Sequence, residues 1–477
     1  MKSSSLIYKL LENEGVVRRD LPENSPVRSL VPPNTDFEFG SLASRAHAAA
    51  RNHSFRNSLR PPQPSQPRLV SSSEGPLKQM LFTIPDGTTN GEFADIYNKL
   101  LETLPDATEI VCLVNTSSKS DVERWLRLHN REQTSTIVEA PNHVGFSIWA
   151  QDAYAVSSTT TNETYFIEPL SFLRYADAVI SDYVSNATGL KNFQTPLYFQ
   201  GGNILVGDDF WLIGIDYPEK TLAYVENAIF PNPGETPEQL VRRLYTEYLD
   251  NNRKLTYVGS TVPVPSEQLL LVRENGQYFV DHVFQGNHDG TAQPLFHIDM
   301  FLTLAGRDSA NKYQVLVGDP SLAPPPASPN WNSYAMQNVY DSVARSLQNA
   351  GMTVIRNPLP ITFVTKQILV SQLNDPNDPS LQAIYQQLTN EGVTQVALRS
   401  WYFATANNAL VQIAQNDKHV WLPTYGHGTY SYLAESDAAN KRIWERLGFN
   451  VTALPSFHRL ARGLGAVHCI QKYLARG

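Results

Sequence analysis

The chain has 477 residues, a formal net charge of −8 and only two cysteines, Cys112 and Cys469. The negative charge argues against non-specific nucleic-acid binding as the main function. No window approaches the ~18 consecutive apolar residues of a membrane span, and the first residues lack the sustained apolar run of a signal peptide. Two cysteines exclude a disulfide framework and a multi-cysteine zinc site, so we expect a reducing, cytoplasmic location.

The first 78 residues differ in composition from the remainder. Residues 41–73 contain no acidic residue but five arginines among serine, proline and alanine. The proline-rich residues 61–67 are incompatible with a regular helix or a central strand. We therefore predict a disordered basic arm over residues 1–78. It would serve as a solvated linker, a secretion or translocation signal, or a tail that binds a protein partner.

Residues 79–477 are expected to form one folded domain in which apolar strands alternate with amphipathic helices. The first half predicts helices at 91–104, 121–130 and 236–249, and strands at 79–84, 109–114, 136–139, 165–169, 196–199, 203–206, 210–215 and 255–259. The second half predicts helices at 333–350 and 437–447, and strands at 296–304, 314–317, 353–355, 409–414, 418–423 and 450–453. The recurring order of two strands, a helix and a strand favours one repeat-built α/β domain with a central site.

One of the two cysteines stands out by its surroundings. Cys469 follows a glycine-rich run, Gly463-Leu464-Gly465-Ala466-Val467-His468. A thiolate is the strongest side-chain nucleophile near neutral pH, and it needs an electropositive, partly open setting to ionise. The alternative is a buried structural cysteine on a final strand, because free cysteine is among the most buried residue types. Cys112 lies inside an apolar strand, so we predict that it is a core residue.

Three further stretches place polar groups within apolar sequence. Asp152 interrupts a run that otherwise resembles a buried strand, and a buried carboxylate needs a cation or a hydrogen-bonding partner. The sequence Gln200-Gly201-Gly202-Asn203 predicts a turn where glycine permits close backbone approach. In the strand predicted at 296–304, alternation would put His297 and Asp299 on one face.

These groups form a coherent chemical set, although each alone has an ordinary structural explanation as a turn, a cap or a core histidine. A carboxylate accepts a bidentate pair of N–H bonds from a guanidinium, so two carboxylates suit a planar cation. An imidazole suits proton transfer, and a thiol suits covalent attack. No phosphate loop, dinucleotide fingerprint or HExxH motif competes with them.

In chain order, these stretches resemble the guanidino-group-modifying enzymes of the pentein fold, which include arginine, agmatine and peptidylarginine deiminases and amidinotransferases. The resemblance covers about residues 80–477 as short motifs in the right order. The matching stretches are Trp149-Ala150-Gln151-Asp152, Gln200-Gly201-Gly202-Asn203, His297-Ile298-Asp299-Met300-Phe301-Leu302, 407–411, 421–426 and Gly465-Ala466-Val467-His468-Cys469. The first is similar to the W-x-Q-D of peptidylarginine deiminases, and the last to the family's C-terminal G-x-[VIL]-H-C nucleophile.

The resemblance implies a fold and a catalytic set. The fold is an α/β propeller of about five ββαβ-like units around a central site. Asp152 and Asp299 would hold the substrate guanidinium, Cys469 would attack its carbon, and His297 would act as acid and then as base. No metal or cofactor is needed for this chemistry.

Other residues of the motifs take supporting roles by the same resemblance. Trp149, Gln151 and Asn203 are expected to contribute to substrate binding, and His468 only to shape the turn before the nucleophile. Two positions depart from the family pattern: Gln200 stands where several small-molecule members have Glu, and Met300 replaces an acidic or small residue.

The substrate is the least determined part of the prediction. The W-x-Q-D motif favours arginine in a peptide or protein, converted to citrulline and ammonia. A free arginine or agmatine deiminase and an amidinotransferase are the alternatives within the superfamily. A thiol protease with a Cys469–His297 pair and an inactive binding module are the alternatives from other classes. A free amino-acid substrate needs a cation for its α-carboxylate, for which Arg174, Arg307 and Arg459 are candidates.

Overall fold

The computed structural model describes residues 63–477 except residues 162, 171, 173, 226–230 and 416. Most of the predicted arm, up to residue 62, therefore lies outside the described residues. Residues 68–78 belong to the folded domain, because β1 (Arg68–Leu69) pairs with β5 (Ala155–Ser158) and the Leu69 side chain is buried. The folded domain thus begins before the predicted boundary at residue 79.

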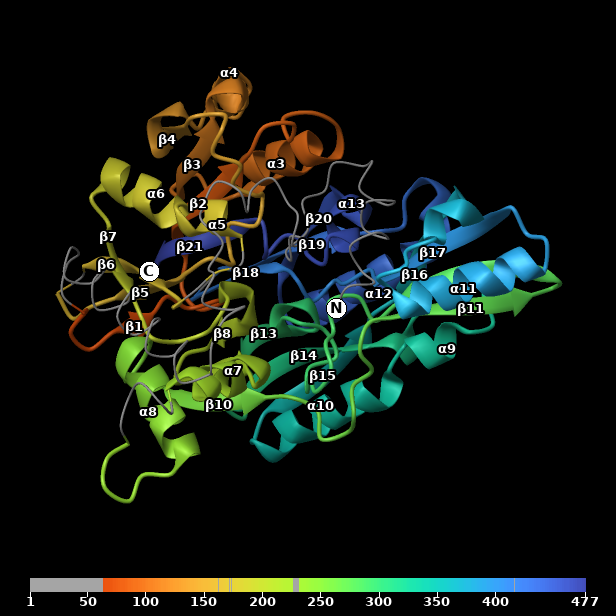
Figure 1. Ribbon diagram of the computed structural model, residues 1–477. Coiled ribbons are helices and arrows are strands. Elements are labelled where there is room, and N and C mark those ends of the chain that lie inside the picture. Colours follow the sequence, from red (N-terminus) through yellow and green to blue (C-terminus); the bar gives the residue numbers. More distant parts are fainter. Residues whose placement is uncertain (1–62, 162, 171, 173, 226–230, 416) are drawn as a thin grey trace.

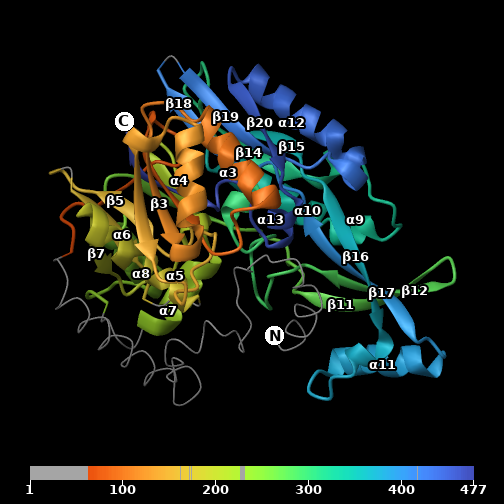
Figure 2. The same ribbon diagram turned by 90° about the horizontal axis from the view of Figure 1, so that it is seen from above.

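Six sheets make up the described part of the chain (Figures 1 and 2). In five of them an antiparallel pair is followed, across one or two helices, by a strand parallel to the second member of the pair. The first such sheet contains β21 (Gln471–Arg476), β2 (Leu77–Ile84) and β3 (Glu109–Asn115), and the second contains β5, β6 (Thr164–Glu168) and β7 (Lys191–Gln194). The third contains β8 (Ile204–Val206), β9 (Phe210–Gly214) and β10 (Lys254–Val258). The fourth contains β13 (Leu302–Arg307), β14 (Tyr313–Asp319) and β15 (Thr353–Pro358), and the fifth contains β18 (Leu410–Ala414), β19 (Asp417–Thr424) and β20 (Asn450–Ser456). The parallel strand β4 (Ser135–Ala140) extends the first sheet, and β1 extends the second.

The helices connect these strands and cover the sheets. The crossover helices are α3 (Gly91–Thr103), α4 (Lys119–Leu128), α5 (Tyr175–Ala178), α6 (Ile180–Thr188), α7 (Asp216–Val225), α8 (Pro237–Tyr248), α9 (Trp331–Tyr334), α10 (Gln337–Asn349) and α12 (Ala434–Arg446). The others are α11 (Pro379–Asn390) and α13 (His458–Arg462). A capping box of Thr236 and Gln239 begins α8, with Pro237 in the first turn.

The sixth sheet, of order β11-β12-β17-β16, lies outside the repeated pattern. Its strands are β11 (Gln268–Glu274), β12 (Gln277–Val283), β16 (Ile361–Leu369) and β17 (Gln395–Phe403). With α11 it extends away from the other sheets in Figure 2 and has a small apolar core of its own. The sequence patterns predict none of these strands.

Three predicted elements differ from the structure. Residues 196–199 form no strand, and β7 provides the strand that pairs with β6. The single helix predicted at 333–350 is divided into α9 and α10, because Met336 adopts a left-handed conformation with φ of 50°. The strand predicted at 296–304 begins only at Leu302, after a 3₁₀ turn at Ile298–Met300.

The repeated pattern positions the predicted site. In each of the five similar sheets, a predicted polar segment stands just before the first strand: Asp152 before β5, Asn203 before β8, Asp299 before β13, Asn408 before β18 and Cys469 before β21. The predicted mixed α/β class is confirmed, and the closed propeller stays a prediction. Among the described residues, no helix is both long and apolar enough to cross a membrane.

Candidate active site

The four predicted catalytic side chains meet at a buried centre. Asp152, His297 and Cys469 have no exposed surface, and Asp299 is 1% exposed. Asp299 Oδ2 lies 3.5 Å from Cys469 Sγ, and His297 Nδ1 lies 3.8 Å from Asp152 Oδ1. The structure therefore brings together groups that the sequence distributes over three separate turns.

Strand alternation, the predicted reason for pairing His297 with Asp299, is wrong. Asn203 Oδ1 accepts a hydrogen bond from the backbone N of Ile298 at 3.0 Å, so this amide does not join a strand ladder. The segment turns as a 3₁₀ helix instead, and β13 starts beyond it. Cys469 likewise lies in the turn before β21 and not on a final strand, and Asp152 lies in the turn before β5.

The catalytic groups converge on the backbone of Gly202. A methyl group on Gly202 would lie 2.5 Å from His297 Nδ1, 3.1 Å from Asp299 Oδ2 and 3.2 Å from Asp152 Oδ1. Only glycine lets the backbone approach these three side chains so closely. We call this position the Gly202 point. Two carboxylates and an imidazole that face one position, next to a thiol, suit a planar cation that undergoes covalent attack.

Asp152 is held in place by a buried arginine. Arg174 Nη2 donates to Asp152 Oδ2 at 2.9 Å, and Arg174 Nε donates to Asp177 Oδ2 at 2.5 Å. The backbone N and hydroxyl of Ser147 both donate to Asp177, at 2.6 Å. Burial lowers the pKa of Arg174, but the charges of Asp177 and Asp152 outweigh burial and raise it overall. This network fixes one oxygen of Asp152 and leaves Oδ1 directed at the Gly202 point.

Asp299 lies next to the predicted nucleophile. Its Oδ2 lies 2.8 Å from His468 Nδ1 as well as close to the Cys469 thiol. Its Oδ1 is buried and has no hydrogen-bond partner within the described parts of the chain. A buried carboxylate oxygen without a donor costs free energy, which a donor on a bound ligand would recover. His468, expected only to shape its turn, thus also contacts the catalytic carboxylate.

The turn that carries the nucleophile is fixed by Asn408. Its Oδ1 accepts the backbone N–H groups of Ala466 at 2.9 Å and of Cys469 at 3.2 Å. Its Nδ2 donates to the carbonyl oxygen of Asp299 at 3.3 Å. A single amide therefore ties the nucleophile turn to the Asp299 turn. Asn408 lies in the family motif at 407–411, but no role was predicted for it from the sequence.

The three residues expected to bind substrate instead contact the turns themselves. The Trp149 ring packs so closely on Gly465 that a methyl group there would lie 2.3 Å from it. Gln151 Nε2 donates to the carbonyl oxygen of Gly201 at 3.2 Å. Asn203 bonds to Ile298, Gln293 and Gly214. In this structure these side chains support the arrangement of the carboxylates and the thiol.

The His297 ring is held between two aromatic side chains. The Phe296 ring stacks on it with centroids 4.0 Å apart, and the Tyr217 hydroxyl lies 3.5 Å from His297 Nε2. These contacts direct Nδ1 toward Gly202 and Asp152. The imidazole is thereby placed where it can give a proton to a group bound at the Gly202 point.

A buried lysine that the sequence did not single out adjoins the centre. Lys472 Nζ donates to the carbonyl oxygens of Gln151 at 3.2 Å and Tyr154 at 2.8 Å. Burial lowers the pKa of Lys472 to about 7, against the opposing effect of Asp152 and Asp299. Lys472 lies in the short segment Ile470-Gln471-Lys472-Tyr473-Leu474 between Cys469 and the end of the chain. For the Arg174–Asp177 pair no signal existed in the sequence, because nothing distinguishes Arg174 from other loop arginines.

The remaining predicted cations are engaged elsewhere. Arg307 pairs with Asp208 at 2.5 Å and Asp209 at 2.7 Å, and Arg459 lies over the Phe93 ring. Arg174 is itself bound to two carboxylates. Within residues 63–477 as described, no cluster of three or more His, Cys, Asp or Glu side chains is arranged to hold a metal ion. Cys112 is a core residue, as predicted, and burial raises its pKa to about 12.

Comparison with known proteins gives matches at the level of structure. No protein-family model and no curated protein sequence matches the chain. The agmatine deiminase of Enterococcus faecalis aligns with a TM-score of 0.51 and 13% identity, over 86% of this chain and 97% of that one. A structural-genomics protein named as an agmatine deiminase aligns with a TM-score of 0.51 and 15% identity, over 86% and 96%.

A third aligned structure, an amidinotransferase from Microseira wollei, has a TM-score of 0.38 and 9% identity, over 86% of this chain and 97% of that one. A TM-score this low does not show a shared fold. At such identities, structural likeness shows the fold and not the reaction. The chain shares the fold of these two agmatine deiminase structures.

Proposed function

We propose that this chain hydrolyses the guanidino group of a small molecule, with Cys469 as the nucleophile. The observation that carries the proposal is the convergence of Asp152, His297 and Asp299 on the Gly202 point, beside the Cys469 thiol. The likeness to agmatine deiminases supports the small-molecule alternative better than the peptidyl-arginine substrate that the W-x-Q-D motif favoured.

Substrate binding follows from the carboxylate oxygens that border the Gly202 point. A guanidinium at the Gly202 point would donate to Asp152 Oδ1 and to Asp299, which gains the donor that its Oδ1 lacks within the described chain. Arg174 keeps the other oxygen of Asp152 occupied, so the carboxylate cannot rotate away. The cation between the carboxylates and the thiol would also favour the thiolate form of Cys469.

The covalent steps use the thiol and the imidazole. Cys469 Sγ bonds to the guanidinium carbon, and the bond from that carbon to one terminal nitrogen breaks. His297 gives that nitrogen a proton, so it leaves as ammonia and a thiouronium remains on the sulfur. His297 then takes a proton from water, which adds to the carbon. The C–S bond breaks, a ureido product leaves, and the thiol is restored.

We also propose that the five similar sheets surround this centre as the units of the propeller that the family resemblance implies. The support is that each of them places the turn before its first strand at the site or beside it. Asn408, from the fifth such turn, bonds to two of the others. The catalytic domain would then comprise the described residues as a whole.

The test is incubation with agmatine, free arginine, benzoyl-arginine amide, methylguanidine and an arginine-containing protein, assayed for ureido product and ammonia. We expect product from a small guanidine and a loss of at least ~10³-fold in Cys469→Ala. No product from any substrate would contradict the proposal. Product from the protein alone would restore the peptidyl-arginine reading. Guanidino transfer to an added amine without ammonia would indicate an amidinotransferase, and cleavage of a peptide bond would indicate a protease.

The intermediate offers a second readout of the same proposal. After acid quenching during turnover, mass spectrometry should find the thiouronium on Cys469 and none on Cys112. The second cysteine is an internal control, because burial in β3 keeps it protonated. Equal modification of both cysteines would contradict nucleophilic catalysis by Cys469.

A further inference from the structure

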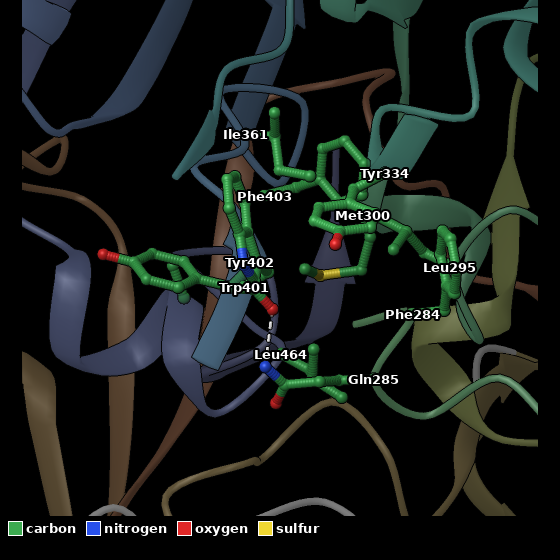
Figure 3. Close-up of a pocket in the computed structure, with 11 residues that line it drawn as sticks. Phe284, Gln285, Leu295, Met300, Tyr334, Ile361, Trp401, Tyr402, Phe403 and Leu464 are labelled. Carbon is green, nitrogen blue, oxygen red and sulfur yellow. Dashed lines mark hydrogen bonds between the residues drawn. The ribbon is translucent and has the colours of Figure 1, made fainter. Parts of the chain in front are cut away.

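A pocket rich in aromatic side chains adjoins the catalytic turns (Figure 3). It lies where β16, β17 and the turn after β12 meet the segments that lead to His297, Asp299 and Cys469. We call it the aromatic pocket. Its five aromatic wall residues are Phe284, Tyr334, Trp401, Tyr402 and Phe403. The sixth sheet, which stands outside the repeated pattern, therefore provides a wall next to the site.

The lining of the aromatic pocket is uncharged, and most of its side-chain polar groups have hydrogen-bond partners, although the buried Trp401 Nε1 has none within the described residues. The Tyr334 hydroxyl donates to Asp281 at 3.0 Å, and the Tyr402 hydroxyl lies 2.8 Å from His458 Nδ1. The Gln285 amide donates to the carbonyl oxygen of Trp401, the dashed line in Figure 3. Rings and aliphatic carbons are thus left to face the cavity, which suits an apolar group.

Two lining residues of the pocket are close in sequence to predicted catalytic residues. Met300 directly follows Asp299, and Leu464 lies on the turn that leads to Cys469; both line the pocket. The Phe296 ring, stacked on His297, and the Leu464 side chain both lie beside Gly286, where a methyl group would be 3.6 Å and 3.0 Å from them. Phe296 therefore contacts both the His297 ring and the turn at Gly286, which directly follows the pocket residues Phe284 and Gln285.

Two lining residues of the pocket adopt a backbone conformation that residues other than glycine rarely take. Phe284 has a φ of 56° and Leu464 a φ of 63°. Left-handed backbone at bulky residues costs free energy and persists where the surroundings impose it, often at ligand sites. The cavity measures about 20 Å³ here, roughly the room of one water molecule. A larger group would displace these two side chains, both of which are on turns.

We propose that the aromatic pocket holds the arm of the substrate, which is a monosubstituted guanidine with an uncharged, apolar arm. The inference rests on the proposed guanidine hydrolysis and narrows its substrate class. The ammonium of agmatine or the α-carboxylate of arginine would be buried in this pocket without a charged partner, at a high desolvation cost. An alkyl or aryl arm would instead bury its surface against the aromatic rings.

The test compares kcat/KM for methylguanidine, butylguanidine, benzylguanidine and agmatine, in the wild type and in two variants. Ala461→Met narrows the pocket, because Ala461 is a buried lining residue on α13. Ala344→Met is the matched control, because Ala344 is a buried residue of the same core cluster and is not among the lining residues. Binding of the same guanidines to Cys469→Ala, measured by calorimetry, gives a readout that does not need turnover.

We expect benzylguanidine to exceed methylguanidine by ~30-fold or more in wild-type kcat/KM and in affinity for Cys469→Ala, with butylguanidine between them. Ala461→Met should reduce that ratio by ~10-fold, whereas Ala344→Met should leave the ratio intact. Equal values for all arms, a preference for agmatine, or a ratio unaffected by Ala461→Met would overturn the inference. Hydrolysis of no guanidine, with the binding preference retained, would contradict the proposed function while supporting the pocket as the site of an apolar arm.

Discussion

The candidate catalytic centre and the aromatic pocket adjoin each other, but different kinds of interaction hold their side chains in place. In the centre, charged groups are tied to other turns by hydrogen bonds, as Asp152 is by Arg174 and Asp299 by His468. In the pocket, neutral rings and aliphatic chains touch without charge, and two of them lie on left-handed backbone. One region has a fixed geometry set by polar partners, and the other has an adaptable apolar wall.

This difference predicts two classes of variant. Removing one member of a buried charged pair leaves the other unpaired, which costs on the order of 3–5 kcal/mol and affects every substrate alike. Changing an apolar wall alters the fit of the arm and leaves the guanidinium end untouched. Variants of the centre should therefore lower activity on all guanidines by the same factor, whereas variants of the pocket should change the ranking among them.

Gly202→Ala is expected to have the largest effect among the variants that keep the nucleophile. Its methyl group would occupy the point between His297, Asp299 and Asp152, within 3.2 Å of all three. We expect kcat/KM to fall by ~10²-fold or more for methylguanidine and benzylguanidine alike, because a displacement of about 1 Å at the reacting centre costs that much. Steady-state kinetics on both substrates measures it, with thermal melting as the check on folding. Retention of a tenth of the activity by a folded variant would break the assignment of the Gly202 point as the guanidinium site.

Substitution of Arg174 comes next in size. In Arg174→Lys a single ammonium replaces the fork that reaches Asp152 and Asp177 at once, so Asp152 loses its fixed orientation. We expect kcat/KM to fall by ~10-fold, equally for charged and apolar guanidines. Arg174→Met would leave two buried carboxylates without their cation, and urea unfolding should show a loss on the order of 3–5 kcal/mol. A loss restricted to substrates with an apolar arm would contradict the separation of the centre from the pocket.

The parts of this site that the sequence predicted are those where a polar residue interrupts an apolar run. Asp152, Asp299 and Cys469 were identifiable in this way, and their order matched a family pattern. The Gln200-Gly201-Gly202-Asn203 turn was also correct, although the role of the Gly202 point required three-dimensional distances. Most strands and helices of the five similar sheets could also be predicted from the spacing of apolar residues, because their buried faces are apolar.

What the sequence could not predict depends on contacts between distant segments. The turn at Ile298–Met300 exists because Asn203 captures an amide that would otherwise enter a strand. The partner of Asp152 is an arginine on another turn, chosen by the fold and not by local pattern. In the sixth sheet, β11 exposes or half-exposes every residue, so no clear alternation marks it, whereas β17 is buried at every residue but the first and shows no alternation for the opposite reason.

Lys472 gives the smallest expected change in activity but a distinct dependence on pH. It adjoins a second small cavity with Gln151 and Gly201, on the side of the centre that the aromatic pocket does not reach. Burial lowers its pKa to about 7 in the folded chain, from an ordinary value of 10.5. Between these values the unfolded chain binds the extra proton, so this group's contribution to the free energy of unfolding rises with pH. Its destabilising effect is complete below pH 7 and is relieved as the pH approaches 10.5.

Lys472→Met removes this titration and therefore isolates it. We expect the difference in unfolding free energy, wild type minus variant, to increase between pH 6.5 and pH 9.5 by several kcal/mol, because one pKa unit corresponds to ~1.4 kcal/mol. Urea unfolding at a series of pH values measures it, and Lys254→Met, at an exposed lysine in β10, is the control that should show no such trend. The ammonium bonds to carbonyls on both sides of Asp152, so protonation also supports the centre. Wild-type kcat should then fall as the pH rises above 7, whereas kcat of Lys472→Met should show no such fall. A flat stability difference would mean that Lys472 keeps its charge in the folded chain, and the centre would then carry one more fixed cation than we infer.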